Sequence, residues 1–390
     1  MKSVYKYVLL LLMPCMVGAV LLSCSNDEIG KPFISYIRVT NPTASDSLIA
    51  TAGQGQVLAI MGSNLQAVRQ VWFNDQPALI YPTFITSTTV ITQVPSVLPT
   101  VISNKLKMIF ANGDSLLYDF SVDISKPRID YAKSEYANEG DSLFIYGGYF
   151  YKPFTVTFTG GQQAELISVD DDATAVVVKV PTGAQPGPIT ITTNFGEATS
   201  NFWFEDNRNI IANFEGPFVN GWWRGGDFVV ASDPDIANIN GKFMRVNKGP
   251  LSAWPYLELY GGPADGDVAT LTKVIPEAAF VNPSGYSLKL EINTLASITG
   301  AYVRLYLGSA GGGTFGDARN NIYYIWQPNI STHGTWQTVT IPWSDVYTGN
   351  QLFPYNSSGY GMYIYCHGPN AANYNFALDN IRVVPNTSTN

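Results

Sequence analysis

The chain has 390 residues, of which 46% are hydrophobic and only 13% are charged, and its formal net charge is −8. The sequence contains no basic stripe, so this acidic balance argues against binding to the phosphates of nucleic acids. The length is sufficient for about two to three domains. Frequent glycine, proline, aromatic and β-branched residues, without a long helical apolar period, predict an all-β protein.

The first residues have the pattern of a secretion signal. Lys2 and Lys6 precede an apolar run at 7–22, which is short for a membrane-spanning helix of about 20 residues. The segment Leu21-Leu22-Ser23-Cys24 ends this run and resembles a bacterial lipoprotein box. Residues 1–23 are therefore predicted to be a signal peptide, with an ordinary transmembrane anchor as the alternative.

The residues that follow fit export to the cell surface. On the lipoprotein interpretation, Cys24 receives the lipid and residues 24–31 form a tether. The acidic pair Asp27-Glu28 resembles the surface-export signal of Bacteroidetes lipoproteins, so we expect an outer-membrane lipoprotein that is exposed at the cell surface. With Cys24 lipidated and the signal removed, Cys366 has no internal disulfide partner and is expected to be a small buried residue.

The first half of the chain contains an internal repeat. Both copies begin with Lys-Pro-x-Ile-x-Tyr, continue with Gly-x-x-Leu-x-Ile-x-Gly and later end a strand in Val-Pro, at 31–36, 55–62 and 94–95 and again at 126–131, 140–147 and 180–181. Such matching intervals indicate a duplicated module. Short alternating strands between turns predict a small antiparallel sandwich for each copy.

This pattern resembles the immunoglobulin-like IPT/TIG family. We therefore expect IPT/TIG-like domains at residues 32–124 and 125–206. Neither module contains a histidine, and we interpret both as spacers that hold the last domain away from the membrane.

The composition changes near residue 206, after which six of the eight tryptophans occur. Residues 207–390 are predicted to form a larger β-sandwich, because alternating apolar runs at 287–292, 301–307, 336–341 and 360–365 each bury one face. Its end segments, 211–216 and 376–383, resemble the first and last strands of jelly-roll carbohydrate-binding modules. In such modules the terminal strands often pair around a structural calcium, and by this resemblance Glu215 and Asp379 are candidate ligands.

Several aromatic residues of this last domain are expected in loops beside amides, prolines or arginine. A flat indole can cover the apolar C–H face of a sugar ring, while amide and guanidinium groups hydrogen-bond its hydroxyls. Neighbouring side chains on an extended backbone point oppositely, so only one of Trp222 and Trp223 is expected to meet a ligand. Trp336 and Trp343 are expected to be structural. The candidate glycan-binding residues are Trp222, Trp223, Arg224, Trp254, Tyr256 and Trp326.

Taken with these segments, the whole chain resembles the surface glycan-binding lipoproteins of Bacteroidetes polysaccharide-utilisation loci, of the SGBP-B type. The resemblance implies tandem immunoglobulin-like domains and a C-terminal domain that captures a neutral polysaccharide of the β-glucan, xyloglucan or mannan type without catalysis. It also implies an importer complex and surface hydrolases as partners, with no cofactor beyond the candidate calcium.

Two other functions compete with this interpretation. A surface adhesin or structural lipoprotein would use the same aromatics for protein contacts. A glycoside hydrolase would need two carboxylates flanking the scissile bond, and none of the acidic residues of the last domain stands in a recognisable catalytic motif. The two histidines, His333 and His367, lack the spacing of a zinc site.

Overall fold

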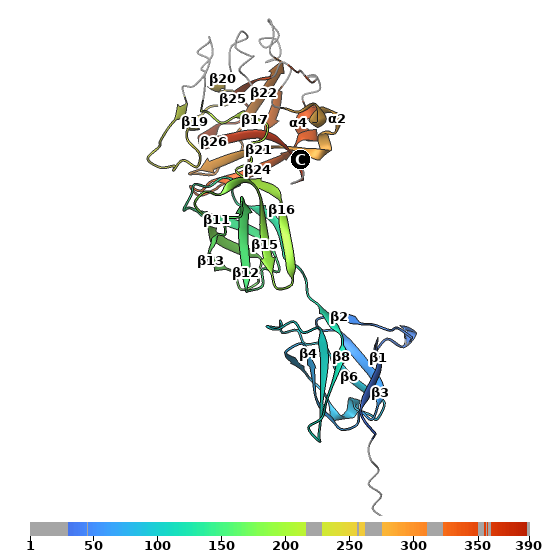
Figure 1. The fold of residues 1–390 in the computed structure, drawn as a ribbon. Coiled ribbons are helices and arrows are strands. Elements are labelled where there is room, and N and C mark those ends of the chain that lie inside the picture. Colours follow the sequence, from blue (N-terminus) through green and yellow to red (C-terminus); the bar gives the residue numbers. More distant parts are fainter. Residues whose placement is uncertain are drawn as a thin grey trace, which may run out of the picture. The chain divides into compact units, whose positions relative to one another are not determined.

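The protein is described by a computed structural model at residues 30–44, 46–215, 228–255, 257–261, 275–309, 323–349, 355, 357 and 360–387. The predicted signal peptide and Cys24 lie outside these residues. Strands dominate, with a few short helical turns, which confirms the all-β prediction (Figure 1). No helix in the described part is long and apolar enough to cross a membrane. The chain divides into two compact units, residues 1–124 and 125–390.

The first unit is a β-sandwich around one apolar core that includes Leu58, Ile60 and Met108. Its elements are β1 (Phe33–Val39), η1 (Pro42–Ala44), β2 (Thr51–Gly53), β3 (Val57–Ser63), β4 (Val68–Phe73), β5 (Gln76–Ala78), η2 (Pro82–Phe84), β6 (Thr89–Gln93), β7 (Lys105–Phe110), β8 (Ser115–Asp119) and β9 (Ser121–Asp123). One sheet has the order β1–β3–β6 and the other β5–β4–β7–β8, while β2 and β9 form a parallel pair.

The second unit begins with another small sandwich, here called the second domain, whose core residues lie between Ile129 and Phe204. Its strands are β10 (Arg128–Ala132), β11 (Ser142–Gly148), β12 (Phe154–Thr159), β13 (Glu165–Val169), β14 (Ala175–Lys179), β15 (Gln185–Thr193) and β16 (Gly196–Phe204). They form two sheets, β10–β11–β14–β13 and β12–β15–β16.

The repeated glycines of the two modules have the same physical reason. Gly55 and Gly140 have positive φ angles of 76° and 84°, a region that favours glycine. A Cβ on Gly62 would lie 2.0 Å from the carbonyl oxygen of Phe33, and one on Gly147 would lie 1.8 Å from that of Arg128. A backbone carbonyl of the neighbouring strand thus occupies the place of a side chain in both copies, so the sequence repeat is also a structural repeat.

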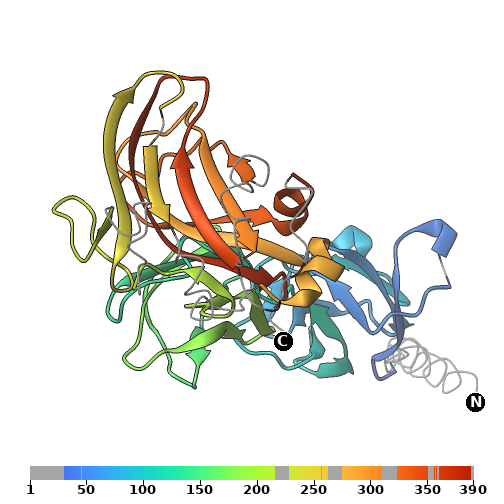
Figure 2. The same ribbon diagram turned by 90° about the horizontal axis from the view of Figure 1, so that it is seen from above.

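The rest of the second unit, here called the C-terminal domain, is a larger sandwich (Figure 2). Its elements are β17 (Ile210–Ala212), β18 (Val229–Val230), β19 (Phe243–Leu251), β20 (Leu257–Gly261), α2 (Glu277–Val281), η3 (Pro283–Gly285), β21 (Tyr286–Thr294), β22 (Val303–Ser309), β23 (Tyr323–Trp326), β24 (Gln337–Pro342), α4 (Trp343–Gly349), β25 (Tyr360–Cys366) and β26 (Ala372–Pro385). One sheet has the order β18–β19–β26–β21–β24 with β17 paired to β26, and the other has the order β20–β25–β22–β23. The pairing of β17 with β26 joins the two ends of the domain, as the jelly-roll resemblance implied.

Residues expected to be structural lie inside this domain. Trp343 is fully buried where α4 begins, and Trp336 is 8% exposed and donates from Nε1 to the carbonyl of Ala237, 2.7 Å away. Cys366 is fully buried on β25, and burial raises the pKa of its thiol well above the usual value. These positions confirm the structural interpretation of both indoles and of the cysteine.

The second domain docks on the outward face of the sheet that contains β26 and β21 (Figure 1). On β21, Leu290 and Ile292 face the core, while Glu291 faces the other way and is equally buried. Glu135 of the second domain reaches across to this face. Its carboxylate accepts hydrogen bonds from Nζ of Lys289 and from Nη2 of Arg382, the latter at 2.6 Å.

Further hydrogen bonds complete this junction. Arg382 also donates to Glu291 at 3.0 Å, and Ser134 of the second domain donates to the other carboxylate oxygen of Glu291 at 3.0 Å. The backbone N–H of Glu135 donates to Oγ1 of Thr338 at 2.7 Å. The two domains therefore share one buried, paired set of charges, here called the junction network: Glu135, Lys289, Glu291 and Arg382.

Asp379 lies beside the junction network on β26, and its carboxyl group is buried. Its Oδ1 accepts the backbone N–H of Asn380 at 2.7 Å, whereas Oδ2 is buried without a hydrogen-bond partner among the described residues. Burial is the main cause that raises the pKa of Asp379 to about 9, with smaller contributions from the carboxylates of Glu291 and Glu215 and opposing ones from Asn380 and Arg382. Asp379 is therefore in its neutral form at pH 7 and adds no negative charge beside the junction network.

Replacing Arg382 with methionine tests the junction network. Arg382→Met leaves Glu135 and Glu291 buried without their shared partner, and it is expected to lower the free energy of unfolding of the second unit by about 3–5 kcal/mol. Chemical denaturation measures this loss. Lys105→Met, which breaks an exposed ion pair with Asp119, is the matched control and should change stability little. Equal effects of the two variants would show that the junction network does not stabilise the fold.

The protonation of Asp379 predicts a pH dependence of stability. Because the folded pKa lies above the unfolded value of about 3.9, folding binds a proton, and the contribution to stability is complete at low pH and falls as pH rises toward 9. Relative to Asp379→Asn, the unchanged protein is expected to lose up to about 1.4 kcal/mol per pH unit between pH 5 and 8. Unfolding curves across this range measure the difference, and parallel curves would contradict the neutral acid.

Candidate functional site

An exposed tryptophan marks one edge of the sheet β20–β25–β22–β23. Trp254 lies in the connection between β19 and β20, and its relative exposure is 55%. Its φ is 55°, and its backbone N–H donates to the carbonyl of Gly368, 2.6 Å away. Its ring centroid lies 5.2 Å from that of His367, just after β25. The backbone thus holds the indole beside the sheet while more than half of the residue stays open to solvent.

His367 and Arg304 connect this indole to the outward face of the sheet. Nδ1 of His367 lies 3.1 Å from the carbonyl oxygen of Pro255, and the carbonyl of His367 accepts a 2.9 Å hydrogen bond from Nε of Arg304. The guanidinium of Arg304 lies over the Tyr323 ring, 4.5 Å from its centroid. Arg304 follows the buried Val303 on β22, so alternation directs its side chain away from the core.

We call Trp254, Arg304, Tyr323 and His367 the sheet-edge cluster. It combines aromatic rings with a fixed guanidinium and an imidazole, and it contains no carboxylate. Aromatic faces suit the C–H faces of a sugar, and the nitrogen groups suit its hydroxyls. Among the described residues, no group of three or more His, Cys, Asp or Glu is placed to hold a metal ion. The chemistry of the sheet-edge cluster is that of recognition by stacking and hydrogen bonding.

The structure describes only some of the predicted glycan-binding residues. Trp254 is exposed, as a stacking platform requires, and its contact with a ligand stays a prediction. The other aromatic candidates and the arginine cannot be placed because they lie outside the described residues: Trp222, Trp223, Arg224 and Tyr256.

The prediction for Trp326 was wrong. Trp326 is only 7% exposed and belongs to the main core of the C-terminal domain. It is the last residue of β23 and pairs with Val303 of β22. Because β23 continues through this residue, the strand alternation still applies to it and directs the indole inward. Its ring therefore has almost no exposed surface for a sugar.

Sequence reasoning missed Arg304, Tyr323 and His367. Arg304 could have been found from the sequence. It alternates with apolar residues in the predicted strand 301–307, which places it on the outward face. Tyr323 lies in the same aromatic run as Trp326, three residues before it. His367 had no such pattern, since its approach to Trp254 depends on a contact between residues more than a hundred positions apart.

Glu215 and Asp379, the candidate calcium ligands, belong to no group of three or more His, Cys, Asp or Glu that could hold a metal ion among the described residues. Calcium takes about six to eight oxygen ligands. The Glu215 carboxylate accepts the backbone N–H of Lys242 and lies against Gly241, and the pKa of Asp379 is raised because burial favours its neutral form. The calcium site therefore stays a prediction.

Two family models match the chain. Residues 204–385 match the surface glycan-binding protein B xyloglucan binding domain, and residues 43–122 match the IPT/TIG domain. An IPT/TIG domain-containing protein from Bacteroides ovatus is 31% identical over 178 residues, which is 42% of this chain. The match spans only 36% of the length of that relative.

Two solved structures share the fold over nearly the full length. The surface glycan-binding protein PbSGBP-B from Prevotella bryantii is 23% identical with a TM-score of 0.61, and the match covers 92% of this chain and 99% of the other. SGBP-B from a complex xyloglucan utilization locus in Bacteroides uniformis is 18% identical with a TM-score of 0.50, covering 91% and 99%. Residues 204–385 therefore match the surface glycan-binding protein B xyloglucan binding domain, and the chain shares its fold with two solved surface glycan-binding proteins.

Proposed function

We propose that this chain is a non-catalytic surface protein that captures a neutral polysaccharide of the β-glucan class. The observation on which the proposal rests is the exposed indole of Trp254, fixed at the sheet edge of a domain that belongs to a glycan-binding family. Xyloglucan is the first glycan to test, because the matching family model describes xyloglucan binding. Mixed-linkage glucan and mannan are the comparisons.

The sheet-edge cluster supports binding by a small number of oriented contacts. The Trp254 ring offers a face for one sugar, and its backbone hydrogen bond to Gly368 limits the entropy lost on binding. Arg304 is oriented by the carbonyl of His367 and by the Tyr323 ring, so its remaining N–H groups are available in a fixed direction for hydroxyls. Such contacts are modest singly and add up along a polysaccharide.

The proposed setting is the outer surface of the cell. The lipoprotein box at Cys24 supports a lipid anchor in the outer membrane, and the domain order shared with SGBP-B proteins supports exposure at the surface. A protein held there would concentrate polysaccharide near an importer complex and surface hydrolases, which are its proposed partners.

Substitution of Trp254 tests the proposed function. Trp254→Ala is expected to weaken binding to the preferred polysaccharide about tenfold or more, because loss of a main aromatic contact costs about 1.4 kcal/mol or more. Affinity gels with xyloglucan, mixed-linkage glucan and mannan measure the retardation. Tyr81→Ala removes an equally exposed ring from the first unit and should leave retardation unchanged.

The same samples separate the competing functions. Retardation of the unchanged protein by none of the glycans would reject glycan capture and favour an adhesin. New reducing ends after incubation with the bound polysaccharide would show hydrolysis and reject the non-catalytic role. Equal retardation of Trp254→Ala and the unchanged protein would remove Trp254 from the site.

A further inference from the structure

The sheet β10–β11–β14–β13 of the second domain presents a row of aromatic rings on its outward face. Tyr131 and Tyr146 are cross-strand partners on β10 and β11, and their rings stack with centroids 4.8 Å apart and planes at 19°. Phe144 precedes Tyr146 by two positions and therefore points to the same side, while Ile145 between them fills the core. We call Tyr131, Phe144 and Tyr146 the aromatic row.

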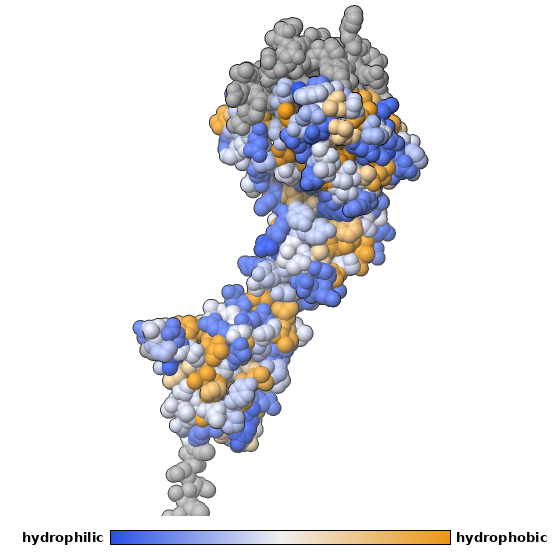
Figure 3. All heavy atoms as spheres, turned by 180° about the vertical axis from the view of Figure 1, so that it is seen from behind, coloured by the Kyte–Doolittle hydropathy of each residue, from blue (hydrophilic) through white to orange (hydrophobic). Residues whose placement is uncertain are grey.

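The aromatic row is accessible. Tyr131 is 55% exposed and Phe144 is 38% exposed, so both rings can be reached from the solvent. Figure 3 shows hydrophobic residues gathered on the surface of the second domain. Neighbouring exposed rings on one face of a sheet form an apolar patch, which is the kind of surface that proteins use for binding.

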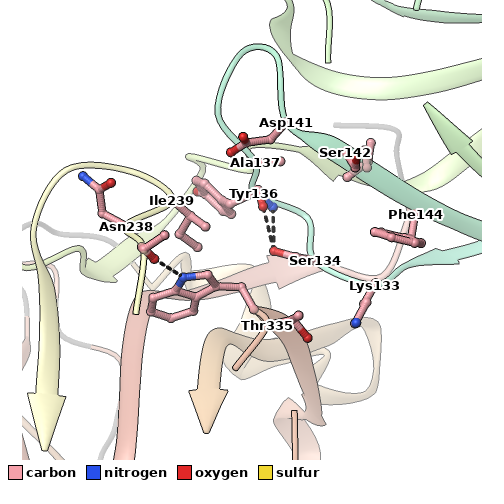
Figure 4. Close-up of a pocket in the computed structure, with 13 residues that line it drawn as sticks. Lys133, Ser134, Tyr136, Ala137, Asp141, Ser142, Phe144, Asn238, Ile239 and Thr335 are labelled. Carbon is pink, nitrogen blue, oxygen red and sulfur yellow. Dashed lines mark hydrogen bonds between the residues drawn. The ribbon is translucent and has the colours of Figure 1, made fainter. Parts of the chain in front are cut away.

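The aromatic row leads to a cavity between the second and C-terminal domains. Phe144 and Lys133 line one side of this cavity and Asn238 and Ile239 the other, as Figure 4 shows. Its volume is about 310 Å³, at the lower end of the range of about 300–1,000 Å³ in which proteins hold small ligands. The junction network ties the two walls together, so the cavity is formed before any ligand arrives.

The lining of the cavity combines apolar rings and uncharged polar groups with the charged side chains of Lys133 and Asp141. Trp336 contributes to the wall and is fixed by its hydrogen bond to Ala237. The hydroxyl groups of Ser142 and Thr335 and the amide group of Asn238 also line the cavity. The more exposed ring of Phe144, with a rim of hydroxyls and an amide, matches a sugar unit, which has apolar faces and an equatorial rim of hydroxyls, whereas Trp336 is mostly buried.

The charges near the aromatic row do not favour a charged ligand. Arg128 and Asp130 form a bidentate ion pair with each other, at 2.7 and 2.9 Å. The Nζ of Lys133 lies 5.5 Å from the centroid of the Phe144 ring, and Asp141 of opposite charge lines the same cavity. Both signs are present in similar number, so the surface fits a neutral partner.

We propose that the aromatic row and the adjoining cavity form a second binding surface for a neutral glycan chain. This inference rests on the proposed function, because a polysaccharide held at the sheet-edge cluster is present at high effective concentration near the second domain. The second surface then needs only weak affinity of its own. The second domain, interpreted from its sequence as a spacer, thus takes part in capture.

Variants of the two most exposed rings test this inference in the full chain. Tyr131→Ala with Phe144→Ala is expected to weaken binding to the long polysaccharide about three- to tenfold and to leave binding of a short oligosaccharide unchanged. Isothermal titration with both ligands measures this. Tyr131→Phe keeps the stack and should retain binding, and Phe84→Ala, an exposed ring of the first unit, is the matched control.

Hydroxyl-radical footprinting supplies an independent readout. The long polysaccharide is expected to protect Tyr131 and Phe144 from oxidation, whereas the short oligosaccharide is not. Unchanged affinity of the double variant while Trp254→Ala weakens binding would overturn the second surface and leave the proposed function intact. If the two rings became protected when only the protein concentration was raised, without glycan, the aromatic row would be a contact between copies of the chain. That result would also overturn the inference. Absence of binding by the unchanged protein would reject the proposed function itself.

Discussion

The contact between Glu135 and the pair Lys289 and Arg382 is the constraint on which the second unit depends. Charges removed from water are tolerated only when they are paired and hydrogen-bonded, so this contact allows one arrangement of the two domains and penalises others. It places β21 and β26 between two packed surfaces, and both faces of these strands are buried. The other sheet, β20–β25–β22–β23, takes no part in this contact.

The same contact determines where the sheet-edge cluster and the aromatic row lie relative to the interface between the two domains. The sheet-edge cluster lies on the sheet that does not dock, and the aromatic row begins where the docking contact ends, at Lys133 next to Ser134 and Glu135. A rigid junction keeps the walls of the cavity in register. If the two domains were joined only by a flexible linker, Trp336 and Phe144 could move apart and the cavity would not be maintained.

The sequence was sufficient for the fold because the relevant patterns are local. Alternation at 287–292 predicted the strand found at Tyr286–Thr294, and the glycine repeat predicted two equivalent sandwiches. The site was less predictable. Exposure of Trp254 was anticipated, but burial of Trp326 depended on where β23 ends. The junction network could not be foreseen, since Glu135 and Arg382 are 247 residues apart and only the folded chain brings them together.

The buried cysteine of β25, Cys366, is an intrinsic probe of transient opening of the C-terminal domain. Cys366 has no exposed surface and an elevated thiol pKa, so alkylating reagents can reach it only when the sandwich opens. In a soluble form that lacks Cys24, every modified molecule has therefore opened at least once. The rate of alkylation counts such events without any introduced label, and glycans that slow it would do so by holding the sandwich closed.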